Sequence, residues 1–196
     1  MTDAHQGLSI PDLPPDCDLI RAALAYAACG WYVGPVARGT KNPGSILGEH
    51  WPSKSSRDTD QIVEWFAGTD AAGIFLHVGR SGGIAWDIDH PENVPDDLAK
   101  FLWLDEADGT RRPLVPFQQT RPDVDRFRGH YLTAQPPGRK IGNSVGDLGN
   151  GWGEVRGTNG VIVVFPTEHP DGGEYRWVLT GVVPETADAI AIRLPD

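Results

Sequence analysis

Two aspartates separated by one residue follow an apolar run, Ile84-Ala85-Trp86, in the middle of the chain. Side chains on a β-strand alternate between its faces, so Asp87 and Asp89 would point the same way. Their Cα atoms would lie about 6–7 Å apart, twice the rise per residue. Carboxylates this close repel one another unless a cation compensates them, and hard oxygen ligands suit Mg²⁺ or Mn²⁺. The alternative interpretation is a polar strand end, or a cap for the turn at Pro91.

A third acid lies in Gly153-Glu154-Val155-Arg156-Gly157. Glu154 and Arg156 would share one face of a strand. As a simple ion pair on a surface they would contribute little to stability. As functional residues, Glu154 would be a third metal ligand. Arg156 would hold a phosphate, because the guanidinium fork matches two phosphate oxygens.

His130 follows Arg128-Gly129 at the beginning of another expected strand. A lone histidine on a strand is more often structural than functional. Here Gly129 would let a ligand approach the backbone closely, and an imidazole can donate a hydrogen bond to a triphosphate oxygen.

The charge of the chain limits how it could hold nucleic acid. The 196 residues carry a formal charge of −10, which argues against binding through a broad basic surface. An enzyme that grips a template locally is still compatible with this charge. The basic residues of the middle of the chain fit either a solvated face or a nucleic-acid groove. They are Arg111, Arg112, Arg121, Arg126, Arg128, Arg139, Lys140 and Arg156.

The elements that must position these residues indicate one α+β domain. Helices are predicted over residues 18–29, 58–66 and 95–104. Strands are predicted over residues 31–36, 73–78, 83–89, 114–119, 129–133, 153–156, 161–165 and 175–179. Residues 79–82 have the composition of a hairpin turn between two of these strands. Residues 38–56 and 135–151 are rich in Gly and Pro and are predicted to be loops, the second one mobile.

Together these residues resemble the bifunctional primase–polymerase domains of the archaeo-eukaryotic primase superfamily, found in phage and plasmid replication proteins. The resemblance extends from about Leu19 to Leu179. Its pieces are, in order, Ala23-Leu24-Ala25-Tyr26-Ala27, Gly30-Trp31, Lys41-Asn42-Pro43, Trp51-Pro52, Thr59-Asp60, Ala72-Gly73-Ile74, Gly79-Arg80-Ser81-Gly82-Gly83, Asp87-Ile88-Asp89, Glu154-Val155-Arg156-Gly157, Gly160-Val161-Ile162-Val163-Val164, Pro166, Gly173, Tyr175 and Trp177.

The resemblance implies a primase-like core, a mixed β-sheet flanked by helices. Asp87, Asp89 and Glu154 would hold two Mg²⁺ or Mn²⁺ ions, Glu154 standing where the family usually has aspartate. His130 would bind the triphosphate and Arg156 the nucleotide. The family usually has Ser-Gly-Gly and one further residue before this histidine. Here the serine is missing, and Arg128 would replace it as a charged donor.

The implied reaction is nucleotidyl transfer from an NTP or dNTP to a 3′-hydroxyl on a single-stranded DNA template. Lys41, in a loop, would be either a further nucleotide contact or an ordinary surface lysine. Trp152 and Tyr131 would stack bases or, as is more usual, pack in the core, and Tyr175 and Trp177 are expected in the core. Residues 1–17 would be a flexible arm and residues 18–196 the catalytic domain. A helicase, fused or separate, is an implied partner.

Two other functions share some of these features. A metal-dependent nuclease would have the acids but less need of His130 and Arg156. A catalytically silent nucleic-acid-binding module would have little reason to keep three acids around one site. The two cysteines and the polar N-terminus, which lacks an apolar stretch, favour a reducing cytoplasm and no membrane.

Overall fold

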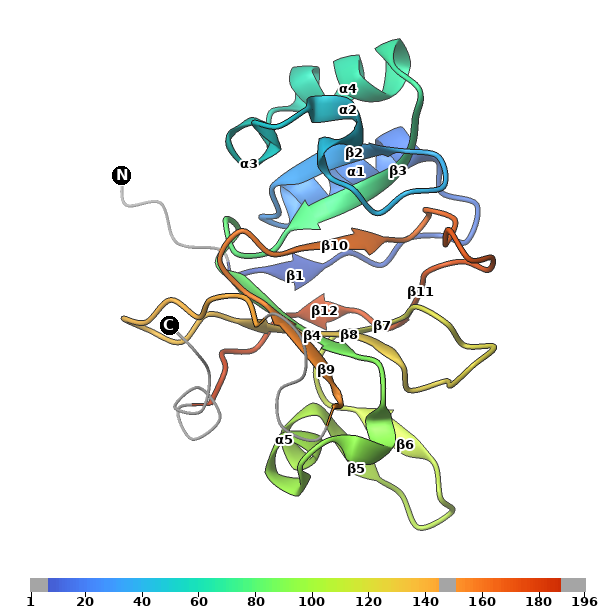
Figure 1. The fold of residues 1–196 in the computed structure, drawn as a ribbon, viewed down its shortest axis with the longest axis vertical. Helices are drawn as coiled ribbons and strands as arrows, with labels where there is room; N and C mark the ends of the chain where they lie inside the picture. The colour runs from blue at the N-terminus through green and yellow to red at the C-terminus, as the bar shows by residue number, and fades with distance from the viewer. Residues whose placement is uncertain (1–6, 145–150, 188–196) are drawn as a thin grey trace.

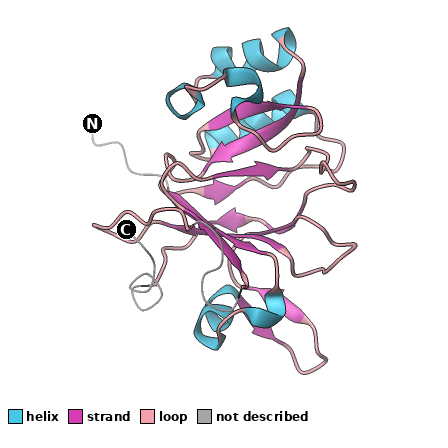
Figure 2. Cartoon of the chain, in the orientation of Figure 1, coloured by secondary structure: helices cyan, strands magenta, loops and turns pink. Residues whose placement is uncertain are grey.

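The computed structural model describes residues 7–144 and 151–187 of the chain. Sheets occupy the middle of the molecule, and helices lie at its two ends (Figures 1 and 2). The predicted α+β class is therefore confirmed. None of the helices in these ranges is both long and apolar enough to cross a membrane.

The first region is an antiparallel sheet with the strand order β10-β3-β2, packed against helices. Asp18 and Asp58 cap α1 and α4 by accepting hydrogen bonds from the amides of Arg21 and Gln61, at 2.8 and 2.9 Å. The elements of this region are α1 (Leu19–Ala28), β2 (Val33–Ala37), α2 (Gly44–Leu47), α3 (Trp51–Lys54), α4 (Thr59–Gly68), β3 (Ala71–His77) and β10 (Val161–Val164).

The second region is an antiparallel sheet of five strands in the order β11-β7-β8-β4-β9, with a helix and two short strands at one end. The one parallel contact that the described residues show is an isolated bridge between Ala134 and Glu185. The elements are β4 (Gly83–Ile88), the 3₁₀ helix η1 (Pro91–Asn93), α5 (Asp96–Leu102), β5 (Trp103–Asp105), β6 (Arg111–Pro113), β7 (Phe117–Gln119), β8 (Gly129–Ala134), β9 (Gly153–Arg156) and β11 (Arg176–Leu179).

Several predicted boundaries are wrong, mostly where elements are short. Residues 38–56 contain the helices α2 and α3, which at four residues each are too short to show helical periodicity. The helix predicted over 95–104 ends at Leu102, where the chain becomes strand β5 and pairs with the unpredicted β6. The loop predicted over 135–151 has no helix or strand in residues 135–144, and residues 145–150 lie outside the described ranges.

The predicted hairpin of β3 and β4 is also wrong. Residues 79–82 do form a tight turn, in which the amide of Gly83 donates to the carbonyl of Val78 at 2.9 Å. Beyond the turn the strands diverge, because β3 pairs with β2 and β10 whereas β4 pairs with β8 and β9. The turn therefore carries the chain from one sheet to the other.

Part of the predicted N-terminal arm is folded. Strand β1 (Ser9–Ile10) pairs with β12 (Gly181–Val182), and Leu8, Ile10 and Cys17 are buried. From residue 7 onward the described chain thus belongs to the folded domain, ahead of the predicted boundary at residue 18.

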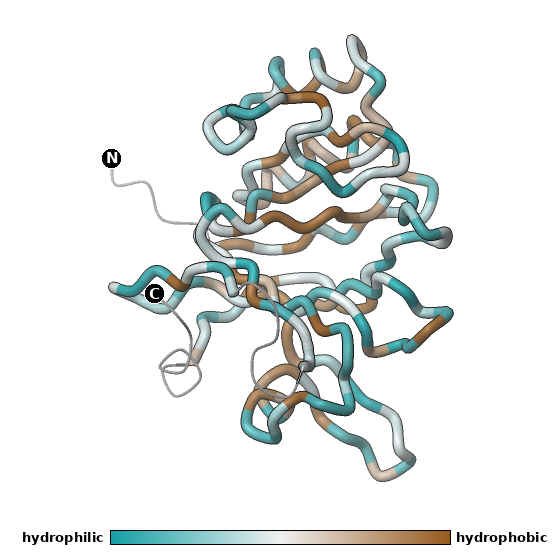
Figure 3. Tube along the Cα trace, viewed as in Figure 1, coloured by the Kyte–Doolittle hydropathy of each residue, from teal (hydrophilic) through white to brown (hydrophobic). Residues whose placement is uncertain are grey.

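Two hydrophobic cores flank the five-stranded sheet. One lies around α1, α4 and the three-stranded sheet, and the other around α5. Apolar stretches follow the inner strands, β10 among them, and polar ones follow the outer loops (Figure 3). Ile84, Trp86 and Ile88 of β4 point into the core at α5, so Ala85 and Asp87 face the three-stranded sheet. Tyr131, Trp152 and Tyr175 are core residues, as expected, whereas Trp177, also expected in the core, is only partly buried against it.

The buried histidine of β3 should make stability depend on pH. Burial, the larger cause, and the nearby charge of Arg80 together lower the pKa of His77 to about 4. An unfolded chain has a histidine pKa of about 6.5, so between these values the unfolded state binds the extra proton. Stability should therefore fall as the pH drops from about 6.5 to 4, by up to about 3 kcal/mol from this group. Urea denaturation of wild type and His77→Gln measures it, and a parallel loss of stability in both proteins would contradict the assignment.

Candidate active site

Distant polar residues form one row across the five-stranded sheet. In the backbone register Asp87 lies directly opposite His130 of β8 on one side and Glu154 of β9 on the other. Gln118 of β7 lies opposite His130 and extends the row. Opposed residues in a sheet share a face, so the structure brings the aspartate, the histidine and the glutamate together. Asp89 lies one residue beyond β4 on the same face.

Arginines neutralise the carboxylates of this row. Arg156 Nη2 lies 2.6 Å from Glu154 Oε2 and 3.4 Å from Asp87 Oδ2. Arg128 pairs with Asp89 in the same way. These guanidiniums compensate negative charges that would otherwise repel one another across the sheet.

A hydrogen-bond chain fixes the ring of His130. The amide of buried Gln118 donates from Nε2 to the carbonyl of Val163 at 2.9 Å, and its Oε1 accepts from the amide of Phe165 at 2.9 Å. The amide orientation is thereby set, and Nε2 also lies 3.1 Å from His130 Nδ1. Nδ1 must then accept, which places the ring proton on Nε2, 3.5 Å from Asp87 Oδ1.

His130 is neutral in this setting. Its side chain is buried, and burial lowers its pKa to about 4, although the charge of Asp87 opposes the shift. The ring therefore presents one N–H donor toward the carboxylate and carries no charge of its own near neutral pH.

The row opens into a polar cavity of about 400 Å³. All the predicted site residues except Glu154 line it, namely Lys41, Asp87, Asp89, Arg128, His130 and Arg156. Glu154 lies beside the cavity, with 29% of its side chain exposed. Lys41 reaches the cavity from the loop after β2, and burial is the main cause that lowers its pKa. The cavity thus combines acids with several cations.

The sequence analysis did not assign three other residues of this cavity to the site, and it named Arg121 only among the basic residues of the middle of the chain. Arg121 lines the cavity together with His169 and Asp171, and Arg121 Nη1 lies 3.8 Å from Asp171 Oδ2. Tyr175, assigned to the core, is indeed fully buried, but it also lines the cavity, and its hydroxyl has no hydrogen-bond partner among residues 7–144 and 151–187. Its ring lies against His130 and His169, with centroids 6.2 and 5.2 Å away.

The donor set fits a hard divalent cation in part. Asp87 and Asp89 offer carboxylate oxygens from one face, the ligands that Mg²⁺ and Mn²⁺ prefer. Within residues 7–144 and 151–187, however, no three acidic, histidine or cysteine side chains converge on one point. Glu154 is instead paired with Arg156. A site with all three acids requires that this arginine move away.

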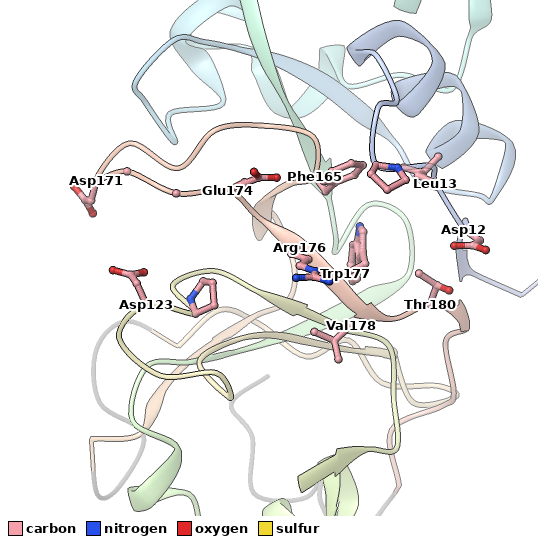
Figure 4. A pocket seen from close by; sticks show the side chains of 14 residues that line it. Asp12, Leu13, Asp123, Phe165, Asp171, Glu174, Arg176, Trp177, Val178 and Thr180 are labelled. Carbon is pink, nitrogen blue, oxygen red and sulfur yellow. The ribbon is translucent and has the colours of Figure 1, made fainter. Parts of the chain in front are cut away.

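A larger cavity of about 840 Å³ lies on the other side of the loop that carries Asp171. Asp12, Asp123, Asp171 and Glu174 line it, and Arg176 is the one basic residue among its described lining (Figure 4). Carboxylates so placed repel phosphate. The cavity at the polar row therefore suits a nucleotide better, although it is the smaller of the two cavities.

One family comparison covers most of the chain. The model of the N-terminal domain of bifunctional DNA primase/polymerase matches residues 23–191. No curated protein and no solved structure matches significantly.

Proposed function

The chain belongs to the family of bifunctional DNA primase/polymerase N-terminal domains, and we propose that it joins an NTP or dNTP to a 3′-hydroxyl on a single-stranded DNA template. The observation that carries the proposal is the alignment of Asp87 with His130 and Glu154 in one row beside a polar cavity. Four cations line this cavity, Lys41, Arg121, Arg128 and Arg156. They match the negative charge of a triphosphate.

The three acids are the proposed ligands of Mg²⁺ or Mn²⁺. When bound, such ions activate the attacking hydroxyl and stabilise the charge on the phosphates. Asp87 and Asp89 present their oxygens to the cavity already, and Glu154 stands beside Asp87.

Arg128 and Arg156 act in two states of the site in this proposal. In the structure they pair with Asp89 and with Glu154 and Asp87. When a nucleotide enters, they turn to its phosphate oxygens and release the carboxylates. Arginine suits both partners because its planar fork binds carboxylate and phosphate alike.

The neutral ring of His130 provides an oriented donor. Its Nε2–H, fixed by Gln118 through Nδ1, lies 3.5 Å from Asp87 Oδ1 at the cavity that would receive the phosphates. A preorganised donor stabilises developing charge without reorganising during the reaction.

Gln118 should therefore act as a positioning residue. In Gln118→Leu the ring of His130 loses its partner at Nδ1 and either tautomer becomes possible. We expect nucleotide incorporation to fall about 10–100-fold, the usual effect of removing an orienting partner. Steady-state incorporation kinetics measure this, with kcat falling more than KM rises.

The neighbouring Gln119, whose amide donates to the carbonyl of Arg126, is the matched control. Gln119→Leu should retain nearly full activity. Equal losses in the two variants would show that position 118 matters only for packing.

Primer synthesis and extension on single-stranded DNA, with Mg²⁺ and then Mn²⁺, test the proposed function. Cleavage of labelled DNA without nucleotides would instead favour the nuclease alternative. The silent binding module would be favoured by a protein that binds nucleoside triphosphate without a divalent cation and makes no primer.

A further inference from the structure

The hydroxyl of Tyr175 is a buried group without a partner at the cavity of the polar row. Tyr175 lies directly before β11, and its side chain is buried although it lines this cavity. Its hydroxyl makes no hydrogen bond to any residue that the structure describes. A buried hydroxyl without a partner destabilises a folded protein, so such a group in a native structure needs an explanation.

The other fully buried tyrosines of the described chain have partners. The hydroxyl of Tyr26 donates to the carbonyl of Phe165 at 2.8 Å and accepts from Nε1 of Trp177 at 2.7 Å. The hydroxyl of Tyr131 donates to a backbone carbonyl at 3.0 Å. Phenylalanine would provide the same ring as Tyr175 without the unpaired group. The hydroxyl at this position therefore suits a partner that enters the cavity.

The surroundings keep this hydroxyl protonated. Burial is the main cause that raises the pKa of Tyr175, and the charges of Asp87 and Asp171 add to it. Both acids line the cavity, so the hydroxyl lies within range of the charges on its walls. A protonated phenol is a hydrogen-bond donor and suits a ligand that carries acceptors.

Two neutral imidazoles lie against the ring of Tyr175. The ring centroids of His130 and His169 lie 6.2 and 5.2 Å from that of the tyrosine. Nδ1 of His169 accepts from the amide of Asp171 at 3.2 Å, which leaves the ring proton on Nε2, as in His130. Burial is also the main cause that lowers the pKa of His169, so this ring is uncharged near neutral pH. Three uncharged donor groups thus line one cavity.

A short backbone loop holds two of these groups in place. The amide of His169 donates to the carbonyl of Gly173 at 2.8 Å. Glu168 and Glu174, on the two sides of this turn, form an isolated antiparallel bridge. His169 and Tyr175, which directly follow these two glutamates, are therefore fixed together at the cavity. Donors fixed in advance bind a charged ligand with little reorganisation.

We propose that the hydroxyl of Tyr175 binds the phosphate chain of the incoming nucleoside triphosphate beside His130, a role that rests on the proposed function. Phosphate oxygens are acceptors, and the four cations of this cavity attract them. The hydroxyl is covered in the structure, so the contact requires the cavity wall to move, as the exchange of Arg128 and Arg156 also does. The bound phosphate then supplies the hydrogen bond that the described fold lacks.

The test uses Tyr175→Phe, which removes the hydroxyl and keeps the ring. The matched control is Tyr26→Phe, which removes an equally buried hydroxyl that has two partners. Isothermal titration calorimetry of the full chain with ATP and with inorganic triphosphate, each with Mg²⁺, measures binding without a template. Urea denaturation in the absence of both compounds measures stability.

We expect Tyr175→Phe to bind both ATP and inorganic triphosphate about tenfold more weakly than the wild type, because a hydrogen bond to a charged acceptor is lost. Its urea midpoint should equal or exceed that of the wild type, because the hydroxyl has no partner in the described fold. Tyr26→Phe should show the opposite pattern, with unchanged binding and a lower midpoint.

Several results would overturn this contact. Unchanged binding in Tyr175→Phe is one, and a loss for ATP alone is another, because the contact would then lie at the sugar or the base. A urea midpoint as low as that of Tyr26→Phe would show that the hydroxyl already has a partner in the folded protein. Equal losses of binding in the two variants, or a wild type that binds neither compound, overturn it as well.

The binding measurements separate this contact from the proposed function. Weaker binding of both compounds in Tyr175→Phe alone supports the contact, even where the wild type makes no primer. Primer synthesis by the wild type, together with unchanged binding in Tyr175→Phe, overturns the contact and leaves the proposed function in place.

Discussion

Asp87→Ala should abolish nucleotide incorporation, with a loss of about 10³-fold or more. Asp87 is the centre of the polar row, in contact with His130 and Arg156 and opposite Glu154. Its removal takes away a proposed cation ligand and also the negative charge that His130 and Arg156 contact in the row. Primer extension with labelled nucleotides on single-stranded DNA measures the loss.

The fold should survive this change. Strand β4 is anchored by Ile84, Trp86 and Ile88, which point to the other face, and Arg156 keeps its pairing with Glu154. Circular dichroism and the unfolding midpoint check this point. The control is Asp105→Ala, which removes an exposed acid of β5 that pairs with Arg111 of β6. This variant should remain active. Incorporation at wild-type levels by a folded Asp87→Ala would remove the metal-site assignment.

Arg156→Lys should lower incorporation about 10²-fold although it keeps the positive charge. Arg156 Nη2 reaches Glu154 and Asp87 together, and the proposed exchange to phosphate needs the planar fork. A lysine offers a single ammonium on a flexible stem and cannot bind two oxygens in the same way. Kinetics over a range of nucleotide concentrations should show a raised KM with a lowered kcat.

Arg112→Lys is the matched control for this substitution. Arg112 also pairs with a glutamate, Glu106, but lies on β6 outside the cavity. It should show wild-type kinetics. If Arg156→Lys also showed wild-type kinetics, a positive charge at position 156 would be enough for activity. The planar fork of the guanidinium would then have no role.

Much of the site was predictable because strand alternation is a local rule. It places Asp87 with Asp89, and Glu154 with Arg156, on common faces without knowledge of the fold. The meeting of β4, β8 and β9 in one register is not local. Only the resemblance to a known family indicated that His130 and Glu154 would lie beside Asp87, and the register confirms that they do.

The missed residues depend on contacts that no short pattern shows. Gln118 looks like an ordinary polar position in a strand, yet its amide is buried and orients His130. His169 and Tyr175 reach the cavity through an irregular segment between β10 and β11. The hairpin of β3 and β4 was wrong for a related reason, because turn composition does not determine which strands will pair.

Paramagnetic broadening of backbone amide signals by Mn²⁺, in the presence of a nucleoside triphosphate, tests the central claim most directly. We expect the first signals lost to be those at the end of β4, the beginning of β8 and Glu154, with little broadening in Asp89→Asn. Broadening that began instead at the acids of the larger cavity, such as Asp12 and Glu174, and left β4 unaffected would contradict the proposed site.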